Sequence, residues 1–304
     1  ERLTAPVAAQ EEPMYPPRFR YEAPTSLDEA ISLLQQGEGE AKVLAGGQSL
    51  VPMLKLRFAS PDLLVDINNV PGLDHLERDA DGTIRIGALC RHQDIERSAL
   101  IAEHQPTIAA AARLVADPIV RTRGTFVGSL CHADPQGDWA ACAVALDGSI
   151  VAQGPGGRRS IPAREFVTGP FDNALARDEI AVEAVIPPPT GVARGGYLKL
   201  ERRIGDFATA AVAVALDLVG DRVERAGIAL VGVGGTTIDA HEAADALVGQ
   251  PLTAATIDRA AELAASAAQP RSDHRGSASY KRHIVHTFTA RILTGIDGSN
   301  QKAA

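Results

Sequence analysis

The chain has 304 residues, of which 45% are hydrophobic and 22% are charged, and this profile is typical of a globular protein rather than a disordered one. Its net charge of −8 argues against nucleic acid as a partner, because phosphate recognition needs an excess of Lys and Arg. No stretch approaches the roughly 20 consecutive apolar residues that a membrane-spanning helix requires.

The start of the chain and its cysteines indicate a cellular setting. Residues 1–13 lack the apolar core of a signal peptide and are expected to be a disordered leader. Cys90, Cys131 and Cys142 are odd in number and form no Cys-x-x-Cys pair, which disfavours a disulfide framework, a zinc ribbon or an iron–sulfur site within this chain. A reducing cytoplasm is therefore the expected compartment.

The first predicted elements form a small α/β lobe that spans residues 14–68. In it, Thr25 or Ser26 can cap a helix whose first turn carries Asp28 and Glu29, and Gly37 can end that helix. We expect, in chain order, a short extended start, this helix, a strand and a second buried strand, at residues 19–21, 25–37, 42–44 and 63–67.

A glycine-rich turn directly follows the strand at 42–44. In this segment, residues 43–50 with the sequence VLAGGQSL, Gly46 and Gly47 lack Cβ atoms, so the backbone can adopt positive φ and a ligand can approach the amides. Successive N–H groups in such a turn can bind an anion, and the Ser49 hydroxyl can donate to it. We hypothesise that this loop holds the pyrophosphate of a dinucleotide, although most Gly-Gly pairs after a strand are only turns.

The next segment, residues 69–187, is expected to be a second lobe made mostly of β-structure with one or two helices. Residues 139–146 form an apolar run that can be helical or extended, and residues 124–129 (GTFVGS) form a second glycine loop of similar chemistry to the first. Strands are predicted at 83–88, 149–153, 159–161 and 180–186, and helical segments at 92–100 and 106–115.

A run of three prolines, Pro187–Pro189, marks the clearest boundary in the chain because proline removes backbone donors and fixes φ. The C-terminal domain is placed at residues 188–304. We expect a three-stranded antiparallel meander at 195–200, 209–219 and 225–233, and three helices at 240–248, 253–268 and 277–293.

Other common functional motifs are weak or absent. A Rossmann fingerprint would need a third glycine where residues 232–235 are followed by Thr237, so a hairpin turn is the better interpretation. No Gly-Lys-[Ser/Thr] of a P-loop occurs. A hydrolase nucleophile elbow around Ser49 would need glycine at Val51.

Two polar groups in the C-terminal part have competing interpretations. His283 and His286 lie three residues apart on a predicted helix, but a metal site needs at least one more ligand, so a polar helix face is favoured. Lys199 lies close to a charged stretch at 202–206. This group is either a solvated charge cluster or a place from which Lys199 reaches into a ligand cleft.

Taken together, the two glycine loops, the proline boundary and the stretch YLKLERRIGDFA at 197–208 resemble the FAD-binding medium subunit of the molybdenum hydroxylases, with carbon monoxide dehydrogenase medium subunits as the nearest type. The resemblance covers residues 14–293. It includes further matches at 117–118, 132–135 and 272–276. It implies an α+β fold, with a two-lobed FAD-binding domain of the PCMH/vanillyl-alcohol-oxidase-like kind followed by the C-terminal domain of sheet and helices.

The resemblance also implies the residues that bind FAD. The two loops would wrap the pyrophosphate with no helix dipole needed, Asp138 would contact the FAD, and Ile180 would lie against it. Lys199 would lie near the isoalloxazine, where a positive charge stabilises the anionic reduced flavin, and Tyr197 close to that ring. The candidate cofactor-binding residues are Val43, Leu44, Ala45, Gly46, Gly47, Gln48, Ser49, Leu50, Gly124, Thr125, Phe126, Val127, Gly128, Ser129, Asp138, Ile180, Tyr197 and Lys199.

The second loop departs from the family pattern. Relatives usually have Gly-Gly-Asn where this chain has Val127-Gly128-Ser129. Val127 is β-branched and resists positive φ, so the backbone is expected to differ here if the family loop needs that geometry. Ser129 offers a hydroxyl in place of an amide.

The resemblance implies an electron-transfer role with FAD as the only cofactor of this chain. A small [2Fe–2S] subunit would relay electrons from a large molybdopterin subunit, in a dimer of heterotrimers, and the FAD would pass them to a quinone or another acceptor. The complex would be cytoplasmic and could associate with the inner face of the membrane. Two alternatives stay open: a stand-alone FAD-dependent reductase or oxidase of the same fold, and a non-enzymatic scaffold whose glycine loops are only turns.

Overall fold

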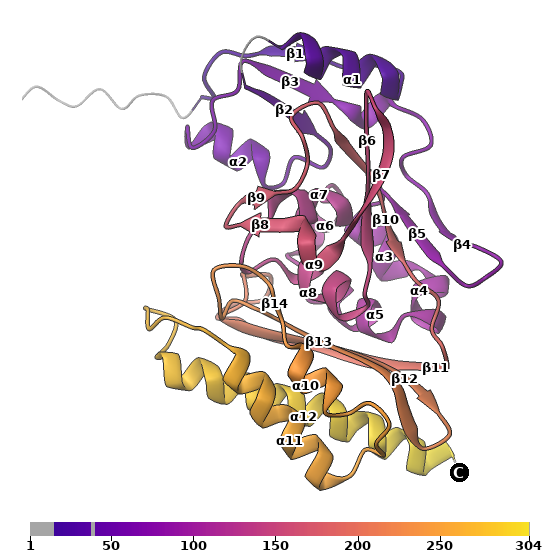
Figure 1. The fold of residues 1–304 in the computed structure, drawn as a ribbon. Helices are drawn as coiled ribbons and strands as arrows, with labels where there is room; N and C mark the ends of the chain where they lie inside the picture. The colour runs from indigo at the N-terminus through magenta and orange to yellow at the C-terminus, as the bar shows by residue number, and fades with distance from the viewer. Residues whose placement is uncertain (1–14, 38–39, 304) are drawn as a thin grey trace, which may run out of the picture.

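The computed structural model describes residues 15–37 and 40–303, and the expected leader at 1–13 lies outside the described residues. Figure 1 shows three parts stacked along the long axis: a small N-terminal lobe, a middle part built on a five-stranded sheet, and a C-terminal sheet covered by helices. The α+β fold class is confirmed. No helix in the described part of the chain has the length and apolarity to cross a bilayer.

The N-terminal lobe is the predicted α/β unit. Its three strands pair in parallel in the order β1-β3-β2. Of the two capping residues proposed, Ser26 is the one that caps α1, because its hydroxyl accepts from the Glu29 N–H at 3.2 Å. The elements are β1 (Arg20–Glu22), α1 (Leu27–Gln36), β2 (Ala41–Leu44), α2 (Leu50–Lys55), β3 (Leu63–Asp66) and η1 (Ile67–Asn69).

The middle part is an antiparallel sheet of order β4-β5-β10-β6-β7 with helices packed against it. Its strands are β4 (Leu76–Arg78), β5 (Ile84–Gly87), β6 (Ser149–Gly154), β7 (Gly157–Pro162) and β10 (Ile180–Ile186), with a separate small hairpin of β8 (Val167–Gly169) and β9 (Asp172–Asn173). Its helices are α3 (His92–Arg97), α4 (Ala99–His104), α5 (Pro106–Ala112), α6 (Pro118–Arg121), α7 (Phe126–His132), α8 (Asp138–Ala145) and α9 (Ala163–Phe166).

The expectation of a mostly β middle lobe with one or two helices is therefore wrong. Most of the extra helices are short and begin at a capping side chain, such as Ser98 for α4 and Asp117 for α6. The run at 139–146, which the sequence left as helical or extended, belongs to the helix α8. Every residue of α8 is buried, so its sequence lacks the alternation of apolar and polar faces that identifies a surface helix.

The second glycine loop is also not a free loop. Thr125 is the N-cap of α7, its hydroxyl accepts from the Gly128 N–H at 3.1 Å, and residues 126–129 form the first turn of the helix. Four residues of the segment described from sequence as a glycine loop therefore belong to a helix. Val127 lies in this helix and has no positive φ, so its β-branch causes no strain.

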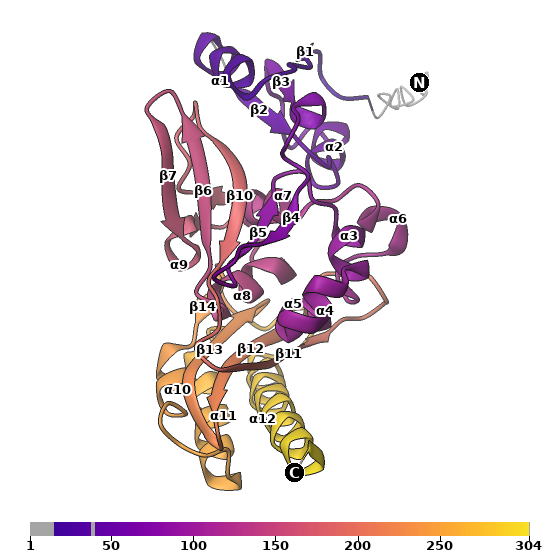
Figure 2. The same cartoon turned by 90° about the vertical axis from the view of Figure 1, so that its right-hand side faces the viewer.

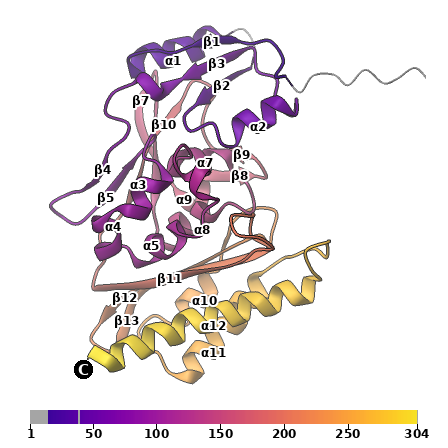
Figure 3. The same cartoon turned by 180° about the vertical axis from the view of Figure 1, so that it is seen from behind.

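The C-terminal domain has four strands rather than the three predicted, in the order β11-β12-β13-β14, because the chain after the Gly232 turn adds a two-residue edge strand. The three predicted helices are present and lie together on one face of this sheet (Figure 3). The elements are β11 (Val192–Leu200), β12 (Ala210–Val219), β13 (Arg222–Val231), β14 (Ile238–Asp239), α10 (His241–Asp245), α11 (Ala254–Ala267) and α12 (Ala278–Ala303).

The opposite face of the C-terminal sheet packs against α5 and α8 of the middle part. Two glycines make this packing close: a Cβ at Gly195 would overlap the Thr107 hydroxyl, and one at Gly227 would overlap the Ala145 carbonyl oxygen. Thr107 also donates from its hydroxyl to the Val214 carbonyl oxygen at 2.7 Å. The C-terminal sheet is thus packed closely against α8, the helix that carries Asp138.

Candidate functional site

The two glycine loops, nearly 80 residues apart in sequence, meet in the folded chain. A Cβ on Gly46 would overlap the carbonyl oxygen of Arg123 and come within 2.8 Å of the Gly124 Cα, so backbone lies directly on backbone at this point. Figure 2 shows the end of β2 and the start of α2 immediately above α7, as Figure 3 does from another side. This junction between the first two parts of the fold is the candidate functional site.

The first loop has the geometry that a glycine pair permits. Gly47 has φ +74°, a conformation that favours glycine, and a Cβ there would lie 3.1 Å from Leu44 and 3.2 Å from Val51. Ser49 occupies the N-cap position of α2, but its side chain makes no capping hydrogen bond. Its hydroxyl therefore stays available to a ligand, and residues 43–47 of this segment are partly exposed.

The second segment contributes fewer accessible groups than its sequence suggests. The side chains of Phe126 and Val127 are buried in the core at 0% and 2% exposure, so they support the helix rather than face a ligand. Thr125 is also buried and is occupied as the cap of α7. Gly128 and Ser129 are the partly exposed residues, and Ser129 is also one of the two positions, with Val127, where this chain departs from the usual family pattern.

A buried histidine supports the junction from below. His92 donates its backbone N–H to the Gly124 carbonyl oxygen at 2.9 Å, and its ring lies so close to Gly124 that a Cβ there would overlap it. Its Nδ1 accepts from Trp139 Nε1 at 3.0 Å, and Trp139 in turn packs on Phe126 with ring centroids 4.8 Å apart. Burial first, and the charges of Arg121 and Arg91 second, lower the pKa of His92 to about 4.

The stability of the fold should therefore fall as pH drops below the ordinary pKa of histidine. The unfolded chain binds a proton at His92 below about pH 6.5, whereas the folded chain resists it until about pH 4. The contribution is complete above pH 6.5 and is lost between pH 6.5 and 4, and it is worth about 3 kcal/mol of unfolding free energy. Denaturant unfolding at pH 7 and pH 4 should show about this much extra loss in the unmodified chain relative to His92→Asn.

The exposed His274 supplies the control for this pH experiment, because His274→Asn should leave the pH dependence within about 0.5 kcal/mol of the unmodified chain. An equal slope in the unmodified chain and in His92→Asn would show that His92 is not held neutral.

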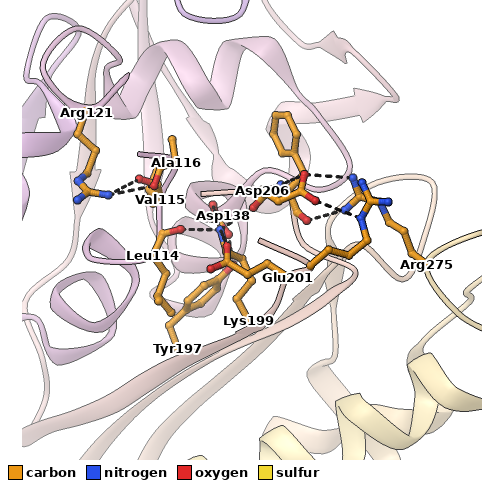
Figure 4. A network of polar contacts seen from close by, with 12 residues as sticks. Leu114, Val115, Ala116, Arg121, Asp138, Tyr197, Lys199, Glu201, Asp206 and Arg275 are labelled. Carbon is orange, nitrogen blue, oxygen red and sulfur yellow. Dashed lines mark hydrogen bonds and ion pairs between the residues drawn. The ribbon is translucent and has the colours of Figure 1, made fainter. Parts of the chain in front are cut away.

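Three of the remaining candidate residues meet in a buried polar cluster between α8 and β11 (Figure 4). The Tyr197 hydroxyl donates to Asp138 Oδ1 at 2.6 Å, and Lys199 Nζ donates to Asp138 Oδ2 at 3.2 Å. Lys199 Nζ also donates to the Leu114 carbonyl oxygen at 2.5 Å and lies 3.3 Å from a Glu201 carboxylate oxygen. The cluster joins the turn after α5 to α8 and β11.

The cluster excludes one of the two interpretations of Lys199. Its side chain is 1% exposed, so it is not a solvated surface charge. Burial raises the pKa of Asp138 against the lowering effect of Lys199, and burial together with Asp138 raises the pKa of Tyr197 well above its ordinary value. A direct contact of these three residues with FAD stays a prediction.

Ile180 and the two C-terminal histidines complete the positions singled out by sequence. Ile180 begins β10, is 2% exposed and belongs to the core, and β10 packs against α7. His286 lies 3.4 Å from Asp258, an ion-pair partner on the neighbouring helix α11. Among the described residues, no group of three or more His, Cys, Asp or Glu side chains is placed to hold a metal ion.

Two polar residues at the junction were missed by sequence reasoning. Asn68 of η1 hydrogen-bonds to the Ala45 carbonyl oxygen in the first loop, and Arg91 at the start of α3 hydrogen-bonds to the Arg123 carbonyl oxygen directly before the second loop. The two side chains also hydrogen-bond to each other. Asn68 comes two residues after the strand β3, and Arg91 four residues after the strand β5, which is the kind of position where site residues occur. No local spacing in the sequence links them.

The groups at the junction fit the diphosphate of a dinucleotide. Gly46 lets the first bend lie directly on the backbone at Arg123, Gly47 turns the chain with positive φ, Ser49 makes no capping hydrogen bond with its hydroxyl, and Ser129 adds a second partly exposed hydroxyl. Such backbone bends with flanking hydroxyls are suited to anionic oxygens.

Two protein-family models match the chain. The model of the FAD binding domain in molybdopterin dehydrogenase matches residues 17–189, and that of the CO dehydrogenase flavoprotein C-terminal domain matches residues 196–296. The first match ends at residue 189 and the second begins at residue 196.

Individual relatives match over nearly the full length. The chain is 39% identical to the carbon monoxide dehydrogenase medium chain of Hydrogenophaga pseudoflava, over 92% of this chain and 97% of that one. It is 38% identical to the nicotine 6-hydroxylase medium subunit of Paenarthrobacter nicotinovorans, over 91% and 96%. A solved structure of the Hydrogenophaga carbon monoxide dehydrogenase lacking the Mo-pyranopterin moiety has a chain that superposes with a TM-score of 0.89 at 40% identity, covering 93% of this chain and 98% of that chain.

These matches and the paired glycine loops lead to the same conclusion. FAD is the cofactor that the N-terminal domain binds, and the protein is an oxidoreductase subunit. The chain belongs to the FAD-binding medium subunits of the molybdenum hydroxylases, the family that includes the carbon monoxide dehydrogenase medium chain.

Proposed function

We propose that this chain is the electron-transfer subunit of a carbon monoxide dehydrogenase-type complex. A small [2Fe–2S] subunit would deliver electrons from a large molybdopterin subunit, and the acceptor would be a quinone or another oxidant, with the complex assembled as a dimer of heterotrimers. The names of the relatives support the assignment of separate roles to separate subunits. These relatives are described as medium chains or medium subunits of a dehydrogenase and a hydroxylase.

The observation that carries the proposal is the contact between the two glycine loops. Loop one at 45–49 and the partly exposed residues of the second segment, Gly128 and Ser129, would hold the FAD diphosphate between them. When bound, FAD supplies a carrier that accepts and donates one or two electrons. The chain's own contribution is to fix the position of that carrier.

The cluster of Asp138, Tyr197 and Lys199 would position the rest of the cofactor. Because Tyr197 and Lys199 both donate hydrogen bonds to the Asp138 carboxylate, the three side chains are held in fixed positions before the cofactor binds. We propose that these three residues orient the isoalloxazine ring of the bound FAD. The positive charge of Lys199 would favour an anionic reduced flavin, as the family resemblance implies. Ile180 would add an apolar contact.

The oxidised substrate is assigned to the molybdenum partner rather than to this chain. The relatives named above act on carbon monoxide and nicotine, as their names state, yet they are 39% and 38% identical to this chain. An almost equal identity to medium subunits with different substrates is expected if the medium subunit does not contact the substrate. The proposal therefore concerns the role of this subunit in the complex and does not assign carbon monoxide as the substrate.

We place the complex in the cytoplasm, where a quinone acceptor would bring it to the inner face of the membrane. The three cysteines of the chain are free thiols in the structure, and this supports a reducing compartment.

Purification of the tagged chain from its native cells tests the proposal. Two further subunits should co-purify in equal amounts with molybdenum, iron and FAD, and the flavin absorbance should bleach only when the complete complex receives its substrate. Steady turnover by the isolated chain with a reductant of its own would favour the stand-alone reductase instead. Isolation of a chain that takes up no FAD on titration would support the scaffold alternative.

A further inference from the structure

Arg91 lies between the two glycine loops and is hydrogen-bonded toward both. It follows β5 as the N-cap residue of α3, and its backbone N–H donates to Asp94 at 3.1 Å. Its guanidinium donates through Nη1 to the Arg123 carbonyl oxygen at 2.8 Å, beside Gly124 of the second segment. Through Nη2 it donates to Asn68 Oδ1 at 2.6 Å.

Asn68 carries the connection on to the first loop. Its Nδ2 donates to the Ala45 carbonyl oxygen at 2.8 Å and to Asp66 Oδ1 at 2.5 Å. Asp66 Oδ1 also accepts from the Asn68 backbone N–H at 2.9 Å. The side-chain amide of Asn68 is therefore held in one orientation by Ala45 and Asp66 together. A continuous path of hydrogen bonds therefore runs from Ala45 through Asn68 and Arg91 to Arg123.

The charge at this junction points to an anion. Arg91 is half-buried, and burial together with the neighbouring charge of Arg123 lowers its pKa. The positive charges of Arg91 and Arg123 thus act on each other at this junction, and the carboxylates of Asp66 and Asp94 offset them only in part, since the pKa of Arg91 is still lowered. An anionic diphosphate nearby would offset the repulsion between the two arginines.

We propose that Arg91 and Asn68 are positioning residues that hold the two loops in register for the FAD diphosphate. This inference rests on the proposed assignment of these loops as the diphosphate site. The forked geometry of the guanidinium is the essential property, since one planar group must reach two acceptors on different segments. A lysine would keep the charge but could not make both hydrogen bonds in that geometry.

The full-length chain, stripped of flavin and titrated with FAD, tests the proposal through the quenching of flavin fluorescence. Arg91→Lys should weaken FAD binding by about 10- to 100-fold even though the charge is kept. The matched control is Arg85→Lys, because Arg85 also joins two segments, with Nε on Asp79 at 2.8 Å and Nη1 on Glu183 at 3.0 Å, away from the loops. It should leave FAD affinity within about twofold.

Two further measurements separate positioning from folding. Methylguanidinium should partly restore FAD binding to Arg91→Ala, whereas methylammonium should not. In the flavin-free chain, Arg91→Ala and Asn68→Ala should speed hydrogen exchange of the amides at 45–47 and 124–125 and leave exchange in α11 unchanged.

The outcomes that overturn the proposal are distinct from those that overturn the proposed function. Normal FAD affinity in Arg91→Lys would show that only the charge matters, and normal affinity in Arg91→Ala would show that the residue has no role. A failure of the unmodified chain to bind FAD would instead contradict the proposed function, and this inference with it.

Discussion

Gly46→Val is expected to abolish FAD retention while most of the fold survives. The new Cβ would overlap the Arg123 carbonyl oxygen and lie 2.8 Å from the Gly124 Cα, so the backbone of the two loops must separate. Neighbouring backbone cannot rotate aside as a flexible side chain could. Overpacking of this kind costs about 3 kcal/mol, and we expect the FAD affinity to fall by at least about 100-fold.

The measurement is the flavin content of the purified chain together with an FAD titration. Gly156→Ala is the matched control, because its Cβ would have no neighbour within 4 Å, and it should keep the affinity of the unmodified chain. Far-UV circular dichroism should show the same helix and strand content in both variants. Stoichiometric flavin in a folded Gly46→Val variant would show that the first loop is not part of the cofactor site.

Lys199→Met is expected to give the largest loss of stability. Lys199 Nζ is the cation shared by the carboxylates of Asp138 and Glu201, at 3.2 and 3.3 Å, and the side chains of Lys199 and Asp138 are 1% and 7% exposed. Without it, two carboxylates are left close together in a poorly hydrated site. Breaking a buried ion pair from one side costs about 3–5 kcal/mol of unfolding free energy.

Chemical denaturation of the flavin-free chain measures this loss without any contribution from the cofactor. Lys42→Met is the control, since Lys42 pairs with Glu40 at 2.9 Å on the surface and is 46% exposed, and its loss should be below about 1 kcal/mol. If Lys199→Met also loses less than about 1 kcal/mol, the buried cluster does not contain a charged Lys199 paired with carboxylates. Restoring stability with a second change, Asp138→Leu, would show that the unpaired carboxylate causes the loss.

Local patterns in the sequence predicted much of the fold. The strand β2 and the turn after it follow from an apolar run that meets a glycine pair, and α1 begins at Ser26, one of the two capping residues proposed. The C-terminal meander follows from long alternating segments separated by turns. The edge strand β14 was missed because a strand of two residues is too short to show an alternating pattern. The helix α7 was missed because Thr125, its N-cap residue, was taken as part of a glycine loop.

The site was predicted in part, and the missing part depends on distant contacts. The glycine loops were found because glycine pairs are visible in the sequence, and the family resemblance paired them. Asn68, Arg91 and His92 act through partners 23 to 47 residues away, and no local spacing shows such partners. Lys199 was singled out from the sequence, but its burial depends on partners far along the chain at Leu114 and Asp138, which no local spacing shows.

The most direct test of the account is a crystal or cryo-electron microscopy structure of the full chain with FAD bound. The account predicts that the diphosphate lies between residues 45–49 and 124–129, with Arg91 still joined to Asn68 and to the Arg123 carbonyl. A nucleotide whose diphosphate lies elsewhere, with these two bends in contact only with each other, would contradict it.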